Sequence, residues 1–177
     1  DALAVATAGD VVAIAAGEYA EELDVPPGVT VRGVCPTETS IATTSSPAVR
    51  LTGEGSVLRD VEVAGTGEIG VALEGAANAT LSGVFVTAAS RHALVVTGGS
   101  VTMSDVWIHD VGGERGRVVS FAGGAEGALS AVVIEDVEGL GFQLIEGASV
   151  DATQLVVRRC TVAPGSSLAG GVRLDSG

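Results

Sequence analysis

The hydrophobic positions of this chain recur in one short pattern: apolar, any residue, apolar, two small or polar residues, apolar, any residue, apolar. Alternation with a period of two predicts β-strands with one buried face rather than helices. The two-residue break inside the later copies, such as Ser82-Gly83 or Ser104-Asp105, indicates a bend between two faces. Six copies follow one another about every 23 residues, at positions 29–34, 56–63, 79–86, 101–108, 127–134 and 150–157.

A second short strand is predicted between successive copies, and a glycine follows it within two or three residues. Its six occurrences lie at 48–51, 70–73, 93–96, 118–121, 141–144 and 171–174. Two strands and their corners cannot bury their inner faces alone, but stacking one repeat on the next does bury them. The pattern therefore predicts an all-β parallel β-helix, a solenoid of about six coils. A leucine-rich repeat would need an asparagine ladder, and the sequence holds only Asn78; a propeller blade would need about 40 residues.

The repeat also sets the expected domain organisation, which is a single domain over residues 1–177. We expect residues 1–10, which are rich in alanine, to be the remnant of a short helical N-terminal cap over the first coil. Residues 11–47 are interpreted as a first coil with insertions, and residues 48–177 as regular coils. The repeat breaks off within a coil at Gly177, so we expect either a continuation of the chain or another cover for the last coil.

Composition narrows the function classes. The chain has 22 acidic residues against nine basic ones, all arginine, for a net charge of −13. This charge argues against nucleic acid as a partner, because phosphates would be repelled. Apolar runs are only a few residues long, which argues against a membrane span. Glycine, with 26 residues, suits a chain that must turn many tight corners.

The stretch from Gly9 to Ile41 resembles the first coil of secreted bacterial proteins with right-handed, pectin-lyase-like β-helix repeats. Its Gly-Asp, Gly-x-Tyr and Pro-Gly-Val-Thr-Val-x-Gly elements carry the resemblance, and the later coils fit it over most of the chain. The resemblance implies right-handed coiling and a secreted, extracellular or cell-surface location in a bacterium. It does not imply one activity, because that superfamily includes lyases, hydrolases, adhesins and structural modules.

Charged residues gather after the last strand position of three consecutive coils. The register stacks His109, Glu135 and Arg158 in one column, and it stacks Asp110, Asp136 and Arg159 in the next. Carboxylates one coil apart would lie about 5 Å from each other, which suits a Ca²⁺ site at Asp110 and Asp136 or an acid/base pair. Asp110, Glu135, Asp136 and Arg159 are therefore the candidate catalytic residues. The competing interpretation is a solvated corner whose charges offset one another.

The motifs of the family's enzymes match only in part. Within the superfamily that the chain resembles, pectate lyases typically carry a V-W-I-D-H stretch, whereas this sequence has Val106-Trp107-Ile108-His109-Asp110, with His and Asp exchanged. An R-x-P-x-x-R segment and the N-T-D, D-D and G-H-G elements of polygalacturonases are missing from the sequence. This mismatch argues against enzyme activity.

One set of equivalent outward-facing positions in successive coils holds apolar residues, although such solvent-facing positions are usually polar. Phe85, Trp107, Val133 and Val156 are predicted to form a ridge over four coils. The ridge could contact a sugar face or another protein chain, or the segment 112–117 could fold over it.

Cys35 and Cys160 lie five coils apart and are not expected to pair with each other. His92 is interpreted as a surface histidine, and Asn78-Ala79-Thr80 matches a glycosylation sequon.

The function that these observations favour is a non-catalytic extracellular module, acting as a structural, adhesive or carbohydrate-binding surface. The expected partners are a cell-surface polysaccharide or another protein chain. No cofactor is expected, with Ca²⁺ as the one option. The alternative is a polysaccharide lyase or glycoside hydrolase, or a fragment of one, that acts on an acidic polysaccharide.

Overall fold

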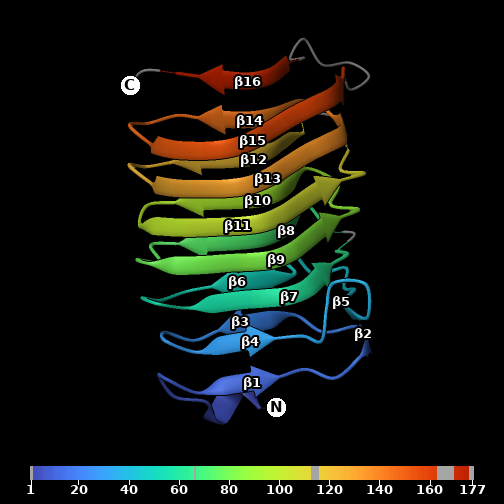
Figure 1. The fold of residues 1–177 in the computed structure, drawn as a ribbon, viewed down its shortest axis with the longest axis vertical. Coiled ribbons are helices and arrows are strands. Elements are labelled where there is room, and N and C mark those ends of the chain that lie inside the picture. Colours follow the sequence, from blue (N-terminus) through green and yellow to red (C-terminus); the bar gives the residue numbers. More distant parts are fainter. Residues whose placement is uncertain (1, 66, 113–115, 163–169, 176–177) are drawn as a thin grey trace.

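The computed structural model describes residues 2–65, 67–112, 116–162 and 170–175. These residues wind into a parallel β-helix of about six coils, and the two termini lie at opposite ends of its long axis (Figure 1). One sheet, called sheet A below, lies in front in that view, and the other, sheet B, lies behind it. The fold class predicted from the repeat is confirmed.

Sheet A contains the longer strands, and each copy of the apolar pattern forms one of them. Within the described residues its main path is β1 (Val11–Ala13), β4 (Thr30–Arg32), β7 (Val57–Val63), β9 (Ala79–Thr87), β11 (Ser100–His109), β13 (Glu126–Glu138) and β15 (Ser149–Thr161). The short strands β2 (Gly17–Tyr19) and β5 (Thr39–Ile41) pair beside this path.

The predicted bend inside each sheet A strand is present. Its second residue takes a left-handed conformation in every regular coil, at Asp60, Gly83, Asp105, Ala131 and Gln154, with φ between 53° and 60°. Left-handed residues turn the chain sharply while the strand pairing resumes on the other side. Each strand of sheet A therefore presents two facets, one before and one after the bend.

Sheet B is formed by the second strand of each coil, as predicted. Its strands are β3 (Leu23–Val25), β6 (Val49–Leu51), β8 (Ile69–Glu74), β10 (His92–Thr97), β12 (Arg117–Ala122), β14 (Leu140–Leu144) and β16 (Gly170–Leu174). All pairings in both sheets are parallel and in register with the repeat, for example Val106 with Val84 and Val132. Inward side chains of the two sheets form one continuous core.

The predicted core positions are buried in four of the six copies, from the second to the fifth. Their exposed fractions are 3% or less at Leu81, Val84, Met103, Val106, Leu129 and Val132. Leu155 is only half-buried, because it lies on β15, the last strand on the sheet A path. Burial of this aliphatic column is the main stabilising contribution that the fold offers.

The first coil departs from the predicted register. Val34, taken above as its third apolar position, is 53% exposed, and the buried position belongs instead to Thr39 of β5. The segment between β4 and β5 loops out, and Ser40 pairs with Glu62 in the strand register. The insertion expected in this coil therefore lies inside the repeat itself and displaces its second half by several residues.

The N-terminal cap is smaller than the sequence suggests. It is a single 3-10 turn, η1 (Leu3–Val5), with no side-chain cap and no buried residue. Three residues cannot repay the cost of nucleating an α-helix, so alanine content alone does not extend the turn. Among the described residues, no helix has the length and hydrophobicity needed to cross a membrane.

Candidate functional site

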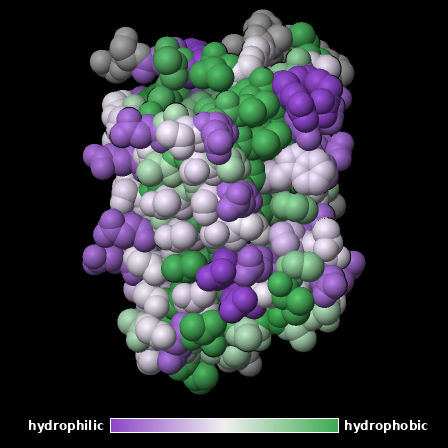
Figure 2. Space-filling model, viewed as in Figure 1, coloured by the Kyte–Doolittle hydropathy of each residue, from purple (hydrophilic) through white to green (hydrophobic). Residues whose placement is uncertain are grey.

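A group of charged side chains lies at the ends of β11, β13 and β15. We call it the charged corner: His109, Asp110, Glu135, Asp136, Arg158 and Arg159. Figure 2 shows hydrophilic residues gathered where β13 and β15 end. The predicted column is present, since His109 pairs with Glu135 and Glu135 with Arg158 in the strand register. Asp110, Asp136 and Arg159 each follow in a left-handed conformation with φ of 53°.

Glu135 is the most enclosed member of the charged corner, with 8% of its side chain exposed. Arg158 Nε donates to its Oε2 at 2.5 Å, Arg159 Nη2 donates to the same oxygen at 2.7 Å, and Trp107 Nε1 donates to Oε1 at 2.9 Å. The hydrogen bond from Arg158 is the main cause that lowers the pKa of Glu135 below its ordinary value. Glu135 is therefore ionised at neutral pH.

Asp136 is held by a two-point contact with Arg159. The distances are 2.6 Å from Nε to Oδ1 and 2.6 Å from Nη2 to Oδ2. This hydrogen bonding lowers the pKa of Asp136, and the same contact raises the pKa of Arg159. Two carboxylates and two guanidinium groups thus offset one another within the corner, while Arg158 and Arg159 keep 56% and 50% of their side chains exposed.

His109 and Asp110 form a second arrangement within the corner. The Nδ1 atom of His109 lies 2.7 Å from Oδ2 of Asp110. The other ring nitrogen, Nε2, has no hydrogen-bond partner among the described residues. The imidazole ring also lies against the indole of Trp107, with ring centroids 4.0 Å apart and planes tilted by 32°. A histidine fixed at one nitrogen by a carboxylate can accept a proton at the other.

The predicted apolar ridge lies beside the corner. Phe85 and Trp107 contact each other edge to face, with centroids 5.2 Å apart, and Val133 and Val156 continue the column in the register. Phe85, Trp107 and Val133 are half-buried, while Val156 is 41% exposed. Part of the segment 112–117, which was considered as a cover for the ridge, lies outside the described residues.

Metal binding at Asp110 and Asp136 stays a prediction. In the part of the chain that the structure describes, no three or more His, Cys, Asp and Glu side chains lie close enough together to hold a metal ion. Asp136 is already occupied by Arg159.

Three other residues singled out from the sequence are not part of the charged corner. His92 is half-buried on β10 rather than on the surface; burial, followed by the charges of Arg91 and Arg117, lowers its pKa from 6.5 to about 4. Cys35 and Cys160 are both free thiols, and burial raises the pKa of Cys160. Sequence reasoning missed the role of Trp107 as a donor to Glu135, for which the repeat carries no signal. In the sequence, the contact between His109 and Asp110 is indicated by the fact that the two residues are neighbours.

Comparison with known proteins finds similarity only at the level of structure. No protein-family model matches the sequence, and no curated protein matches it. A pectin methylesterase solved in complex with a hexasaccharide matches with a TM-score of 0.58 at 13% identity, over 86% of this chain and 61% of that one. The pectin methylesterase of Erwinia chrysanthemi matches with a TM-score of 0.57 at 12% identity, over 90% of this chain and 63% of that one. The chain thus spans about three fifths of the length of these enzymes.

The comparison corrects the function inferred from the sequence. A non-catalytic module was favoured because the signatures of lyases and polygalacturonases are missing, yet the two solved structures described above, which share the fold, are pectin methylesterases, a different class of enzyme. The absence of lyase and polygalacturonase motifs therefore does not exclude another kind of carbohydrate-active enzyme. The confirmed expectation is the architecture: the chain has the right-handed parallel β-helix fold of the pectin-lyase-like proteins.

Proposed function

We propose that this protein is a carbohydrate-active enzyme that hydrolyses an ester on an acidic, pectin-like polysaccharide. The observation that carries the proposal is the contact of His109 with Asp110 at 2.7 Å, beside the half-buried indole of Trp107. The pectin methylesterases that share the fold supply the substrate class. Such a polymer lies outside cells, in keeping with the location predicted from the sequence.

The proposed reaction uses the free nitrogen of His109 as a general base. Nε2 takes a proton from water while the water oxygen attacks the ester carbonyl carbon. The tetrahedral intermediate then collapses, the carbon–oxygen bond to the alcohol breaks, and the imidazolium returns its proton to the departing alkoxide. The products are an alcohol and a carboxylic acid on the polymer, and this acid then loses its proton to water to become a carboxylate. Asp110 fixes the ring and stabilises the imidazolium while it carries the extra proton.

The remaining members of the corner have supporting roles. Trp107 and Phe85 offer an apolar surface on which a sugar ring can lie. The exposed parts of Arg158 and Arg159 offset the negative charge of a protein whose net charge of −13 would otherwise repel a uronate chain. Glu135 and Asp136 hold these two arginines in place through the contacts described above.

Ester hydrolysis fits the corner better than cleavage of a glycosidic bond. A glycosidase needs a carboxylic acid that is still protonated at working pH, which requires a raised pKa. The pKa values of Glu135 and Asp136 are instead lowered by Arg158 and Arg159. Neither carboxylate can therefore deliver a proton to a glycosidic oxygen near neutral pH.

The test is to incubate the protein with methyl-esterified polygalacturonate and to measure released methanol, new reducing ends and unsaturated product. We expect methanol alone. The His109→Gln variant should lower the rate by about 10²–10⁴-fold, the usual contribution of a general base, and Asp110→Asn should lower it less.

His92→Gln is the matched control, because His92 lies on the other sheet and should leave the rate unchanged. Unsaturated product or reducing ends without methanol would replace the proposal with lyase or hydrolase activity. An unchanged methanol rate in His109→Gln would contradict the assignment of the base.

A further inference from the structure

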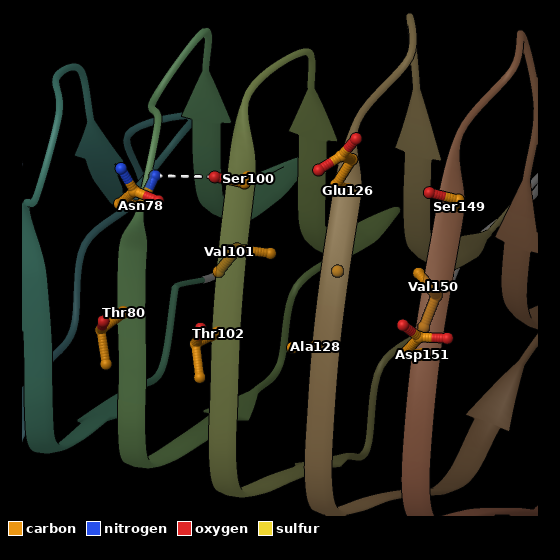
Figure 3. Close-up of a pocket in the computed structure, with 11 residues that line it drawn as sticks. Asn78, Thr80, Ser100, Val101, Thr102, Glu126, Ala128, Ser149, Val150 and Asp151 are labelled. Carbon is orange, nitrogen blue, oxygen red and sulfur yellow. Dashed lines mark hydrogen bonds between the residues drawn. The ribbon is translucent and has the colours of Figure 1, made fainter.

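A polar trough of about 690 Å³ crosses the other facet of sheet A, at the beginning of its strands. It extends over β9, β11, β13 and β15, with the bends of these strands between it and the charged corner. Figure 3 shows its side chains in two rows across the strands. One row is Asn78, Ser100, Glu126 and Ser149, and the other is Thr80, Thr102, Ala128 and Asp151.

The trough is open in its middle because the outward residue there is small. Gly127 lies between the two rows at an inward position, since a Cβ atom added there would come within 2.8 Å of Phe121 and 2.9 Å of Val150. A side chain at Gly127 would therefore enter the core and not the trough. Ala128, next to it on the exposed side, fills little of the space between Thr102 and Asp151.

Most polar side chains of the trough make no hydrogen bond within the protein. Among the described residues, the side chains of Thr80, Thr102, Glu126 and Asp151 have no hydrogen-bond partner, and Ser100 Oγ alone among the side chains of the trough accepts a hydrogen bond, from the backbone N of Asn78 at 2.8 Å. This differs from the charged corner, where Glu135 alone receives three hydrogen bonds. The trough thus keeps hydroxyl and carboxylate groups free for a ligand.

Charge and spacing define the ligand. Glu126 and Asp151 are the ionisable residues of the lining and both are acidic, so a polyanion would be repelled. The rows repeat at the coil spacing of about 4.8 Å, so an elongated ligand with hydroxyl groups at regular intervals can meet the same kind of side chain in each coil. We propose that the trough binds a neutral, hydroxyl-rich glycan segment that lies across the strands. This inference does not depend on the proposed esterase activity, because it concerns a different facet and an uncharged ligand.

The test uses the full chain and three six-sugar probes, namely cellohexaose, xylohexaose and hexagalacturonate, in calorimetric titrations. We expect at least one neutral probe to bind with an affinity that does not change between low and high salt. Ala128→Tyr, which fills the trough, should weaken this binding at least tenfold. Ala122→Tyr on β12 of sheet B is the matched control and should leave it unchanged.

Thr102→Val removes a hydroxyl without changing the shape, and it should weaken binding even if Ala128→Tyr fails to fold. None of these variants should change methanol release, which separates failure of this inference from failure of the proposed function. The inference is overturned if neither neutral probe binds at millimolar concentration, or if Ala128→Tyr and Thr102→Val both bind as the parent does. Stronger trough binding by hexagalacturonate would overturn the argument from charge.

Discussion

The two facets of sheet A differ in how far their outward side chains satisfy one another. At the end of the strands, carboxylates, guanidinium groups and the indole of Trp107 form a connected set of hydrogen bonds. At the beginning of the same strands, hydroxyls and carboxylates line a trough without side-chain partners among the described residues. The backbone repeat is the same on both sides of the bend, so the outward residues alone create the difference.

This contrast shows that a β-helix separates folding from function by position. Inward residues are fixed by stacking, whereas an outward residue can be exchanged with little effect on the coil. The charged corner can therefore hold rigid, preorganised groups suited to a reaction. The trough can offer unpaired groups suited to reversible binding, and both are supported by one core.

The largest expected effect comes from breaking the core that both facets share. Val106→Asp would bury an unpaired charge at a position that is 2% exposed. We expect a loss of about 4 kcal/mol or more in the free energy of unfolding, which lowers Tm by roughly 8–16 °C or more. Thermal melting measures it, and Thr102→Asp on the outward side of the same strand is the control. Equal melting temperatures for the parent and Val106→Asp would disprove the assigned register.

A smaller effect on stability distinguishes the hydrogen-bonded carboxylate of Glu135 from the carboxylate of Glu126, which has no side-chain partner among the described residues. Because its pKa is lowered in the folded state, Glu135 stabilises the protein above its ordinary pKa of 4.5, and this contribution is lost as the pH falls through its folded value. The parent should lose stability as the pH drops below about 4.5. Glu135→Gln should show a shallower loss. Glu126→Gln in the trough breaks no side-chain contact among the described residues, so it should melt with the parent at neutral pH. A Glu135→Gln curve identical to that of the parent would contradict the energetic difference between the facets.

A third effect lies on sheet B and serves as a reference outside both facets. The folded pKa of His92 is about 4, below its ordinary 6.5, so the unfolded chain binds more protons between these values. Stability should therefore decrease as the pH falls from 6.5 to 4. His92→Gln should flatten this part of the curve by a few degrees in Tm, as measured by calorimetry. A parent protein with constant stability over this range would contradict the burial assigned to His92.

The sequence predicts the fold well because stacking imposes one pattern on every inward position. Val84, Val106 and Val132 can be aligned without knowing the structure, and their register is correct. The pattern fails in the first coil, where a loop separates β4 from β5 and Thr39 replaces Val34 inside. Periodicity detects an apolar residue at the expected spacing but not an insertion that moves the true position.

The site was predictable only in part. The stacking of His109, Glu135 and Arg158 follows from the register, and the contact of neighbouring His109 and Asp110 follows from their adjacency. The hydrogen bond from Trp107 to Glu135 depends on side-chain torsions in two strands, which no repeat specifies. The trough depends on Ala128, whose small size is informative only once neighbouring coils are placed in space.

The central claim is that the charged corner receives an acidic, esterified polysaccharide, and one nuclear magnetic resonance signal reports on it. The chain contains a single tryptophan, so its indole N–H gives one signal, and that N–H donates to Glu135. Titration with a methyl-esterified galacturonate hexasaccharide should shift this signal in a saturable manner, while cellohexaose should leave it in place. An indole signal that stays unchanged with the esterified oligosaccharide at millimolar concentration would contradict the account.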